Sequence, residues 1–255
     1  MGRRAARYAG IGETAATAFR APLDALDYWE ERLRQVSIPV EAAGIRFGEP
    51  VLRFSDPDGM RLELVGVAGG SAVTPSRWAD VPAACALQGF HSVTLSEHAL
   101  EPTAEVLTAM GLQQTEREGD RVRYSAAGNA AGTLVDIKLE SQRTHGRLGA
   151  GSVHHIAFRV PDDPTQLAWR EALAEHDLYV TPVRDRMYFH SIYFREHGGV
   201  LFELATDPPG FAADEPEATL GESLKLPPWF EDKRPVLEKA LPPLTVKTGT
   251  PGAMA

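Results

Sequence analysis

The sequence predicts an α+β fold made of three copies of one unit, in which a strand and a helix are followed by three more strands. Two matched stretches indicate the repeat. Residues 47–66 match a later segment at an offset of 140 residues, and residues 18–22 match residues 157–161 at an offset of 139. The matched pairs of the first stretch are Phe54 with Phe194, Gly59 with Gly199, Glu63 with Glu203 and Leu64 with Leu204. Because the offset changes by only one residue, the two stretches belong to one repeated unit.

The three βαβββ units are expected at residues 11–66, 89–140 and 151–206. In the first and third units, tryptophan and leucine recur at helical spacing between the matched stretches. This spacing is typical of an amphipathic helix that packs on a sheet. The middle unit is a weaker copy, with its first strand expected at residues 89–95 and its helix at residues 104–110. Gly111 is expected to end that helix.

The remaining segments are interpreted as connections. Residues 1–10 resemble a remnant linker, and residues 67–88 are rich in small residues and are expected to link the first two units. Residues 207–245 lose the periodicity of strands and are expected to form a tail that wraps the domain, with Trp229 among its apolar anchors. Residues 246–255 are expected to be disordered.

The third unit ends in a predicted β-hairpin. A three-residue loop at residues 197–199 can use Gly199 for its residue with positive φ. In that register Tyr193 lies opposite Glu203, whereas a four-residue loop shifts the pairing by one step. The sequence therefore predicts a plausible contact between these two side chains without requiring it.

The third unit also carries candidate metal ligands. His154 and His155 are expected on its first strand and Glu203 on its last strand, and imidazole with carboxylate is a ligand set for non-haem Fe(II), Mn(II) or Zn. Successive side chains of a strand point to opposite faces, so only one of the two histidines can bind the metal directly, and the pattern does not choose between them. The first unit has alanines in their place, which favours a ligand over a packing role. The first unit keeps a glutamate, Glu63, at the position of Glu203 although it lacks the histidines. This weakens the interpretation of Glu203 as a metal ligand.

Composition limits the function. The chain has 255 residues, of which 43% are hydrophobic, so it can bury a full core. Its net charge of −9 argues against nucleic acid or an anionic membrane surface as a partner. The single cysteine, Cys85, excludes an internal disulfide and indicates a reducing, cytoplasmic compartment. No apolar run has the length of a membrane span or forms a signal peptide.

Units of this order, with His on the first strand and Glu on the last, resemble the vicinal oxygen chelate superfamily of glyoxalases, bleomycin resistance proteins and extradiol dioxygenases. Four runs narrow the resemblance to ring-cleaving dioxygenases of the hydroquinone type. These runs are residues 154–158, 185–196, 202–211 and 226–229. The resemblance covers nearly the whole chain, and its most specific part runs from Tyr188 to Phe211.

The resemblance implies an Fe(II) enzyme, with Mn(II) or Zn as alternative metals, that opens a hydroquinone or catechol-like phenol with O2. It implies that His155 and Glu203 bind the metal. His154, Arg186 and Tyr193 match positions around the metal ligands. Tyr193 or His154 would then act as the acid–base group, and Arg186 would stabilise anionic charge.

The sequence departs from this family in one respect, because the family has four units and the sequence shows three. The unit expected to be missing is the first, whose initial strand supplies the first histidine ligand. The sequence then represents a truncated gene, a mis-assigned start or a genuine short form, with two of three ligands. We expect the unpaired face of the third unit to form a homodimer or to make the chain poorly soluble.

Two other functions remain open at this point. One is a metal-poor or remnant protein that binds an aromatic ligand in the same cleft without catalysis. The other is a glyoxalase-like isomerase that uses Zn or Ni with a more carboxylate-rich site. The metal content of protein purified without oxygen would separate them. His91, on the first strand of the middle unit, is interpreted as a half-buried strand histidine and not as a ligand.

Overall fold

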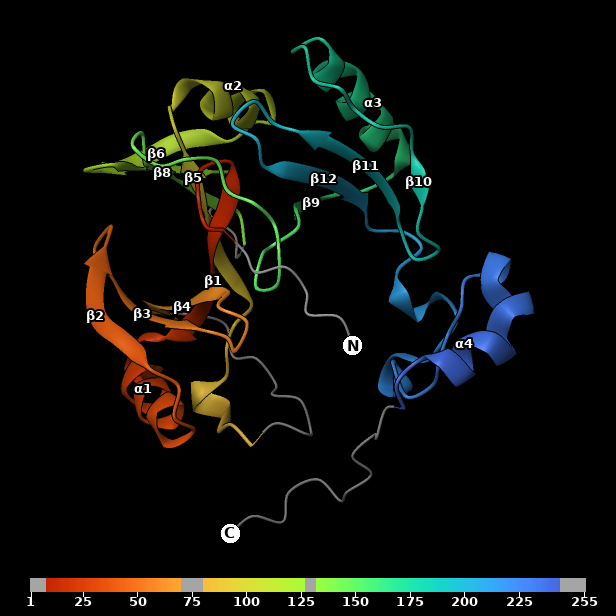
Figure 1. Ribbon diagram of the computed structural model, residues 1–255, viewed down its shortest axis with the longest axis horizontal. Helices are drawn as coiled ribbons and strands as arrows, with labels where there is room; N and C mark the ends of the chain where they lie inside the picture. The colour runs from red at the N-terminus through yellow and green to blue at the C-terminus, as the bar shows by residue number, and fades with distance from the viewer. Residues whose placement is uncertain (1–7, 70–79, 127–131, 244–255) are drawn as a thin grey trace.

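The computed structural model describes residues 8–69, 80–126 and 132–243. The expected disordered segment at residues 246–255 lies outside the described residues, as do most of the remnant linker and half of the linker between the first two units. The strands form two sheets, one of eight strands and one of four, which lie beside each other in Figure 1. No helix in the described part of the chain is long and apolar enough to cross a membrane.

Two βαβββ units build the larger sheet. The first contains β1 (Glu13–Pro22), α1 (Leu26–Gln35), β2 (Val40–Arg46), β3 (Glu49–Ser55) and β4 (Arg61–Val67). The second contains β5 (Phe90–Glu97), α2 (Glu101–Ala109), β6 (Gln113–Glu118), β7 (Arg121–Ser125) and β8 (Leu134–Leu139). The strand order is β2-β3-β4-β1-β5-β8-β7-β6, so the antiparallel pair of β1 and β5 joins the two units. Each unit also pairs its first strand in parallel with its last.

The third unit forms the smaller sheet. It contains β9 (Ile156–Val160), α3 (Asp163–Ala174), β10 (Arg184–Asp185), β11 (His190–Arg195) and β12 (Leu201–Thr206), in the sheet order β10-β11-β12-β9. As in the other units, the first strand β9 runs parallel to the last strand β12. The other edge of β9 pairs with no strand in the described part of the chain.

Helix α3 holds the strands of the smaller sheet in place. Asp162 caps its N-terminus, because the carboxylate accepts a hydrogen bond of 2.8 Å from the backbone N–H of Thr165. One turn later, Gln166 is only 1% exposed, and its Nε2 donates to the carbonyls of His190 and Leu204 at 2.8 Å each. This side chain therefore ties the helix to both β11 and β12, the two strands that carry the candidate site.

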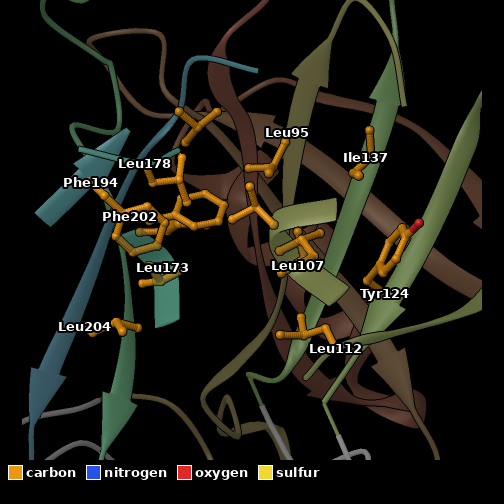
Figure 2. Packing of buried hydrophobic residues seen from close by; sticks show 14 of the residues in the cluster. Leu95, Leu107, Leu112, Tyr124, Ile137, Leu173, Leu178, Phe194, Phe202 and Leu204 are labelled. Atoms are coloured by element: carbon orange, nitrogen blue, oxygen red, sulfur yellow. The ribbon is translucent and has the colours of Figure 1, made fainter. Parts of the chain in front are cut away.

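The main hydrophobic core lies between the second and third units (Figure 2). It combines Leu95 and Ile137 of the larger sheet and Leu107 of α2 with Phe194 and Phe202 of the smaller sheet. Phe194 and Phe202 are at most 1% exposed, and their rings meet edge to face with centroids 5.6 Å apart. The shared core fixes the smaller sheet against the larger one, and no strands pair between the two sheets in the part of the chain that the structure describes.

The predicted hairpin is confirmed, but the predicted first strand of the third unit is too long. Tyr193 pairs with Glu203 in the ladder of β11 and β12, and Gly199 in the loop has a φ of 115°. Strand β9 begins at Ile156, so His154 and His155 precede the strand. The reason lies in the pairing. Strands β1 and β5 pair on both edges and have 10 and 8 residues, whereas β9 pairs on one edge and has 5.

The C-terminal tail forms short helices. These are three 3₁₀ helices at Phe211–Ala213, Glu217–Thr219 and Pro228–Lys233, followed by α4 (Arg234–Ala240). The ring of Phe211 packs on Tyr188 with centroids 5.2 Å apart, which attaches the start of the tail to the third unit. Trp229 is exposed, so it does not act as the buried anchor that the sequence suggested, and the apolar side chains of Phe230 and Leu241 in the same tail are exposed as well.

Candidate metal centre in the third unit

Glu203 lies at the centre of the candidate site. It is in the middle of β12, is paired with Ala157 of β9 on one side and with Tyr193 of β11 on the other, and is only 3% exposed. Its Oε1 atom accepts a hydrogen bond of 3.0 Å from the hydroxyl of Tyr193 and a short one from the hydroxyl of Ser191. Its Oε2 atom lies 2.7 Å from Nε2 of His155. The two carboxylate oxygens therefore have different partners. Hydroxyl groups hold Oε1, and an imidazole faces Oε2.

The two histidines interact with each other. Nδ1 of His154 lies 2.9 Å from Nδ1 of His155, and the two rings are nearly perpendicular. A hydrogen bond at Nδ1 sets the ring orientation of a histidine, and here it leaves Nε2 of His155 directed at Glu203. Alternation along a strand does not apply to the pair, because both residues precede β9.

Arg186 completes the group on its exposed side. It lies in the turn between β10 and β11, where Asp185 accepts a hydrogen bond of 2.7 Å from the backbone N–H of Met187. The Nη2 atom of Arg186 donates to the hydroxyl oxygen of Tyr193 at 3.2 Å, and its guanidinium carbon lies 5.4 Å from the centre of the Tyr193 ring. The phenol oxygen thus receives a hydrogen bond from a cation and donates one to a carboxylate.

All five residues expected at the site, namely His154, His155, Arg186, Tyr193 and Glu203, are connected by these contacts. Sequence reasoning missed Ser191. Its position was available in the pattern, since it lies two residues before Tyr193 on one strand and must share a face of the sheet with it. Within the described residues, no group of three or more His, Cys, Asp or Glu converges on one point. The third unit therefore brings together one imidazole, of His155, and one carboxylate, of Glu203, as candidate ligands.

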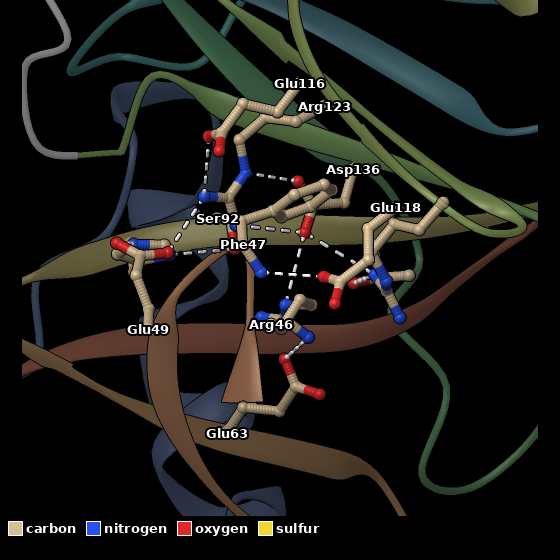
Figure 3. Close-up of polar contacts among 12 residues, drawn as sticks. Arg46, Phe47, Glu49, Glu63, Ser92, Glu116, Glu118, Arg123 and Asp136 are labelled. Carbon is tan, nitrogen blue, oxygen red and sulfur yellow. Dashed lines mark hydrogen bonds and ion pairs between the residues drawn. The ribbon is translucent and has the colours of Figure 1, made fainter. Parts of the chain in front are cut away.

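The larger sheet has arginines at the related positions (Figure 3). Arg123 is paired with Asp136, and its Nε atom donates to the carboxylate at 2.8 Å. Arg46 donates to Glu63 at 2.7 Å, and both side chains are at most 6% exposed. The carboxylates of the first two units thus interact with guanidinium groups, where the third unit presents an imidazole and a phenol.

His91 has hydrogen-bond partners within the protein, as its position on an apolar strand suggested, but it is fully buried and not half-buried as expected. It is 1% exposed, with Nε2 lying 3.1 Å from Oε1 of Glu49 and Nδ1 lying 3.0 Å from the hydroxyl of Ser92. Burial raises the pKa of Glu49, but the hydrogen bonds from His91 and Arg123 outweigh that effect and lower it to about 2. Both ring nitrogens of His91 are occupied within the protein.

Comparison with known proteins identifies the family of the chain. Residues 109–204 match the model of the glyoxalase/bleomycin resistance protein/dioxygenase superfamily. The chain is 44% identical over 239 residues to MhqO of Bacillus subtilis (strain 168), which is named as a candidate ring-cleaving dioxygenase, and the match covers 93% of this chain and 75% of that protein. It is 33% identical over 229 residues to the chlorohydroquinone/hydroquinone 1,2-dioxygenase of Sphingobium indicum, covering 87% of this chain and 70% of that protein.

Solved structures give the same result. A crystal structure of a candidate dioxygenase from Bacillus subtilis superposes with a TM-score of 0.87 at 43% identity, covering 94% of this chain and 77% of that one. Glyoxalase I from Zea mays superposes with a TM-score of 0.59 at 14% identity, covering 79% of this chain and 70% of that one, which shows a common fold alone. The chain therefore belongs to the glyoxalase/bleomycin resistance/dioxygenase superfamily and, within it, to the family of ring-cleaving dioxygenases that includes MhqO.

Proposed function

We propose that the chain acts as an extradiol-type dioxygenase that opens a hydroquinone or catechol-like phenol with O2, with Fe(II) bound by His155 and Glu203. The observation that supports this proposal most directly is the contact between Nε2 of His155 and Oε2 of Glu203, with the other carboxylate oxygen held by two hydroxyls. The names of the relatives support the reaction class.

The donor set suits a metal ion. Enzymes of this superfamily depend on a metal, and one imidazole with one carboxylate suits Fe(II), Mn(II) or Zn. Ser191 and Tyr193 fix the carboxylate through Oε1, and His154 fixes the imidazole through Nδ1, so both ligand atoms are oriented before a metal arrives. When bound, the metal supplies electron transfer between the phenol and O2.

The surrounding side chains move protons and stabilise charge. The hydroxyl of Tyr193 can give its proton to the substrate, and the guanidinium of Arg186 then stabilises the charge left on the phenol oxygen because it already donates to that atom. His154 is exposed beside His155 and can accept a proton from the hydroxyl of an incoming phenol. These roles do not require either residue to bind the metal.

We also propose that a second copy completes the site. The antiparallel pair of β1 and β5 joins the first two units, and β9 holds the same place in the third unit with its outer edge open within the described residues. An apolar groove of about 290 Å³ runs beside this edge, lined in part by Phe90, Val153 and Phe158 together with His155. A unit paired with β9 would cover the groove and face His155 and Glu203.

The test is to express the chain without oxygen in the presence of ferrous iron. We expect His155→Ala and Glu203→Ala to lose iron, and His154→Ala to keep iron but lose oxygen uptake with hydroquinone and catechol. Iron retention by His155→Ala together with iron loss by His154→Ala would reverse the assignment of the ligand. Sedimentation of the same samples reports on the dimer, and a tight-binding, fully active monomer would contradict it.

A chain that binds aromatic ligands without metal and without oxygen uptake would be the non-catalytic member of the family. A glyoxalase-like isomerase is favoured less, because among the described residues the site offers one carboxylate, Glu203, beside His155.

A further inference from the structure

The cleft of the larger sheet has the same framework as the candidate metal centre but different side chains. In the antiparallel ladders, Glu203 is opposite Tyr193, whereas Glu63 is opposite Arg53 and Asp136 is opposite Arg123. The parallel ladders place Glu203 beside Ala157, two residues after His155. In the first two units, Ala16 and Ser92 lie two residues before the strand partners of Glu63 and Asp136. The imidazole is therefore absent from both, and arginine replaces the phenol.

The buried carboxylates of this cleft are already neutralised by arginine. Asp136 is 0% exposed and accepts hydrogen bonds from Arg123 at 2.8 and 3.3 Å. Arg46 donates to Glu63 at 2.7 Å and brings its Nε atom within 3.5 Å of Asp136 (Figure 3). A metal ion at this place would be repelled by two guanidinium groups, so the framework that suits a cation in the third unit is closed to one here.

A cavity of about 270 Å³ opens beside Glu63, Arg53 and Ala16. Its lining carries five basic side chains, namely Arg53, Arg61, Arg121, Lys138 and Arg143, and three acidic ones, namely Glu41, Glu63 and Glu140. The lining therefore has two more basic than acidic side chains, whereas the whole chain has a net charge of −9. The cavity is therefore a local concentration of positive charge on an acidic protein.

The acidic side chains of the cavity do not neutralise all of its basic side chains. Glu63 is shared by Arg46 and Arg53, at 2.7 and 3.5 Å. Glu140 is shared by Arg143 and Lys138, at 2.9 and 3.3 Å. Each of these carboxylates thus faces two cations, which leaves positive charge available to a ligand.

Arg121 and Arg46 also lie where guanidinium groups outnumber carboxylates. Arg121 lies 3.5 Å from Asp136, a carboxylate that it shares with two other guanidinium groups. Burial and the nearby charge of Arg46 lower the pKa of Arg121. Behind Glu63, Arg46 is 4% exposed, and its buried Nη2 atom has no hydrogen-bond partner within the described residues. A buried donor without a partner is destabilising, and a nearby anion reduces that cost.

We propose that this cleft, between the first and second units, binds a small organic carboxylate. The carboxylate group accepts hydrogen bonds from Arg53, Arg61 and Arg121, because guanidinium groups match carboxylates in a two-point contact. The carbon part of the ligand lies against Ala16 and Leu62. At about 270 Å³ the cavity is slightly smaller than the roughly 300–1,000 Å³ that are common for ligand sites, which restricts the ligand to a single ring or a short chain.

The proposal is tested by calorimetric titration with benzoate and with muconate, a six-carbon dicarboxylate, using benzamide as the neutral match for benzoate and inorganic phosphate as the other anion. We expect both carboxylates to bind, more weakly at high salt, and benzamide not to bind. Arg61→Glu and Arg53→Met should each weaken carboxylate binding by about tenfold or more, as expected for one charge-assisted contact. Arg61 is exposed and makes no ion pair in the described part of the chain, so its replacement spares the fold.

Arg34→Glu is the matched control, because Arg34 is an exposed arginine on α1 whose ion pairs in the described part of the chain are with surface glutamates. His155→Ala separates this cleft from the candidate metal centre and should leave carboxylate binding unchanged, whatever becomes of the proposed dioxygenase activity. Equal binding of benzamide, tighter binding of phosphate than of either carboxylate, an equal loss in Arg34→Glu or the absence of heat with both carboxylates would each overturn the proposal.

Discussion

Replacement of Glu97 by glutamine should stabilise the protein at alkaline pH. Glu97 ends β5 in the larger sheet and is 1% exposed, and Glu196, 2% exposed, follows β11 of the smaller sheet. The Oε1 atom of Glu97 is buried without a hydrogen-bond partner among the described residues. Burial, together with the charge of Glu196, raises the pKa of Glu97 from 4.5 to about 8.

The direction of the pH dependence follows from these values. Between about pH 4.5 and pH 8 the folded protein holds a proton on Glu97 that the unfolded chain has released. The free energy of unfolding therefore falls as the pH rises through this window and stops falling above the folded pKa. At about 1.4 kcal/mol per pKa unit the upper limit is roughly 5 kcal/mol, and relaxation of the surroundings reduces the expected effect to about 2 kcal/mol.

Urea unfolding of the wild type and of Glu97→Gln at pH 5 and pH 8.5 measures this effect. The amide cannot ionise, so the variant should match the wild type at the lower pH and exceed it by about 2 kcal/mol at the higher pH. Glu196→Gln is the paired control. Glu196 accepts hydrogen bonds from the Thr103 hydroxyl and from the backbone N–H groups of Gly198 and Val200, so its replacement should destabilise the protein. If Glu97→Gln kept the wild-type pH slope, Glu97 would not be the group that titrates.

Three further predictions concern the site and its support. Tyr193→Phe should lower the rate of oxygen uptake without loss of iron, since in the proposed reaction the hydroxyl transfers a proton and does not bind the metal; an unchanged rate would reduce Tyr193 to a packing residue. Ser191→Ala should weaken iron affinity by about tenfold because it removes one of the two hydroxyls that hold Oε1 of Glu203, and titration with ferrous iron would show no change if Tyr193 alone orients the carboxylate. Gln166→Leu should lower the free energy of unfolding in urea by about 2 kcal/mol, because two carbonyls lose their donor; a stability equal to that of the wild type would mean that water replaces the amide.

Local pattern was sufficient to predict the hairpin of the third unit. Side chains of a strand alternate with a period of two, and a three-residue loop containing glycine predicts Tyr193 opposite Glu203. A four-residue loop would have shifted the pairing by one step, and the structure shows the first register. The repeat was visible for the same reason, since equal elements need equal spacing of apolar residues. The resemblance to a family, and not the periodicity, selected His155 over His154, and in the structure His155 is the one that reaches Glu203.

Other features depend on which elements meet in space. The strand that was expected to carry both histidines is shorter than predicted, because among the described strands β9 has a partner on only one edge. Ser191 joins the site because it shares a face of β11 with Tyr193. Arg46 reaches both Glu63 and Asp136 only because β1 and β5 join two units into one sheet.

The sequence by itself determined the repeated unit, because equal elements recur with periods of two and 3.6 residues along the chain. It offered the pairing of Tyr193 with Glu203 as one of two registers, and the resemblance to a family pointed to the other candidate site residues. The tertiary structure decided the register, and it decided that one cleft brings an imidazole to its carboxylate while the other is filled with guanidinium groups. It also decided that Glu97 and Glu196 become buried beside each other from different sheets. Charge and burial at these places depend on residues far apart in the chain, and local periodicity carries no information about such contacts.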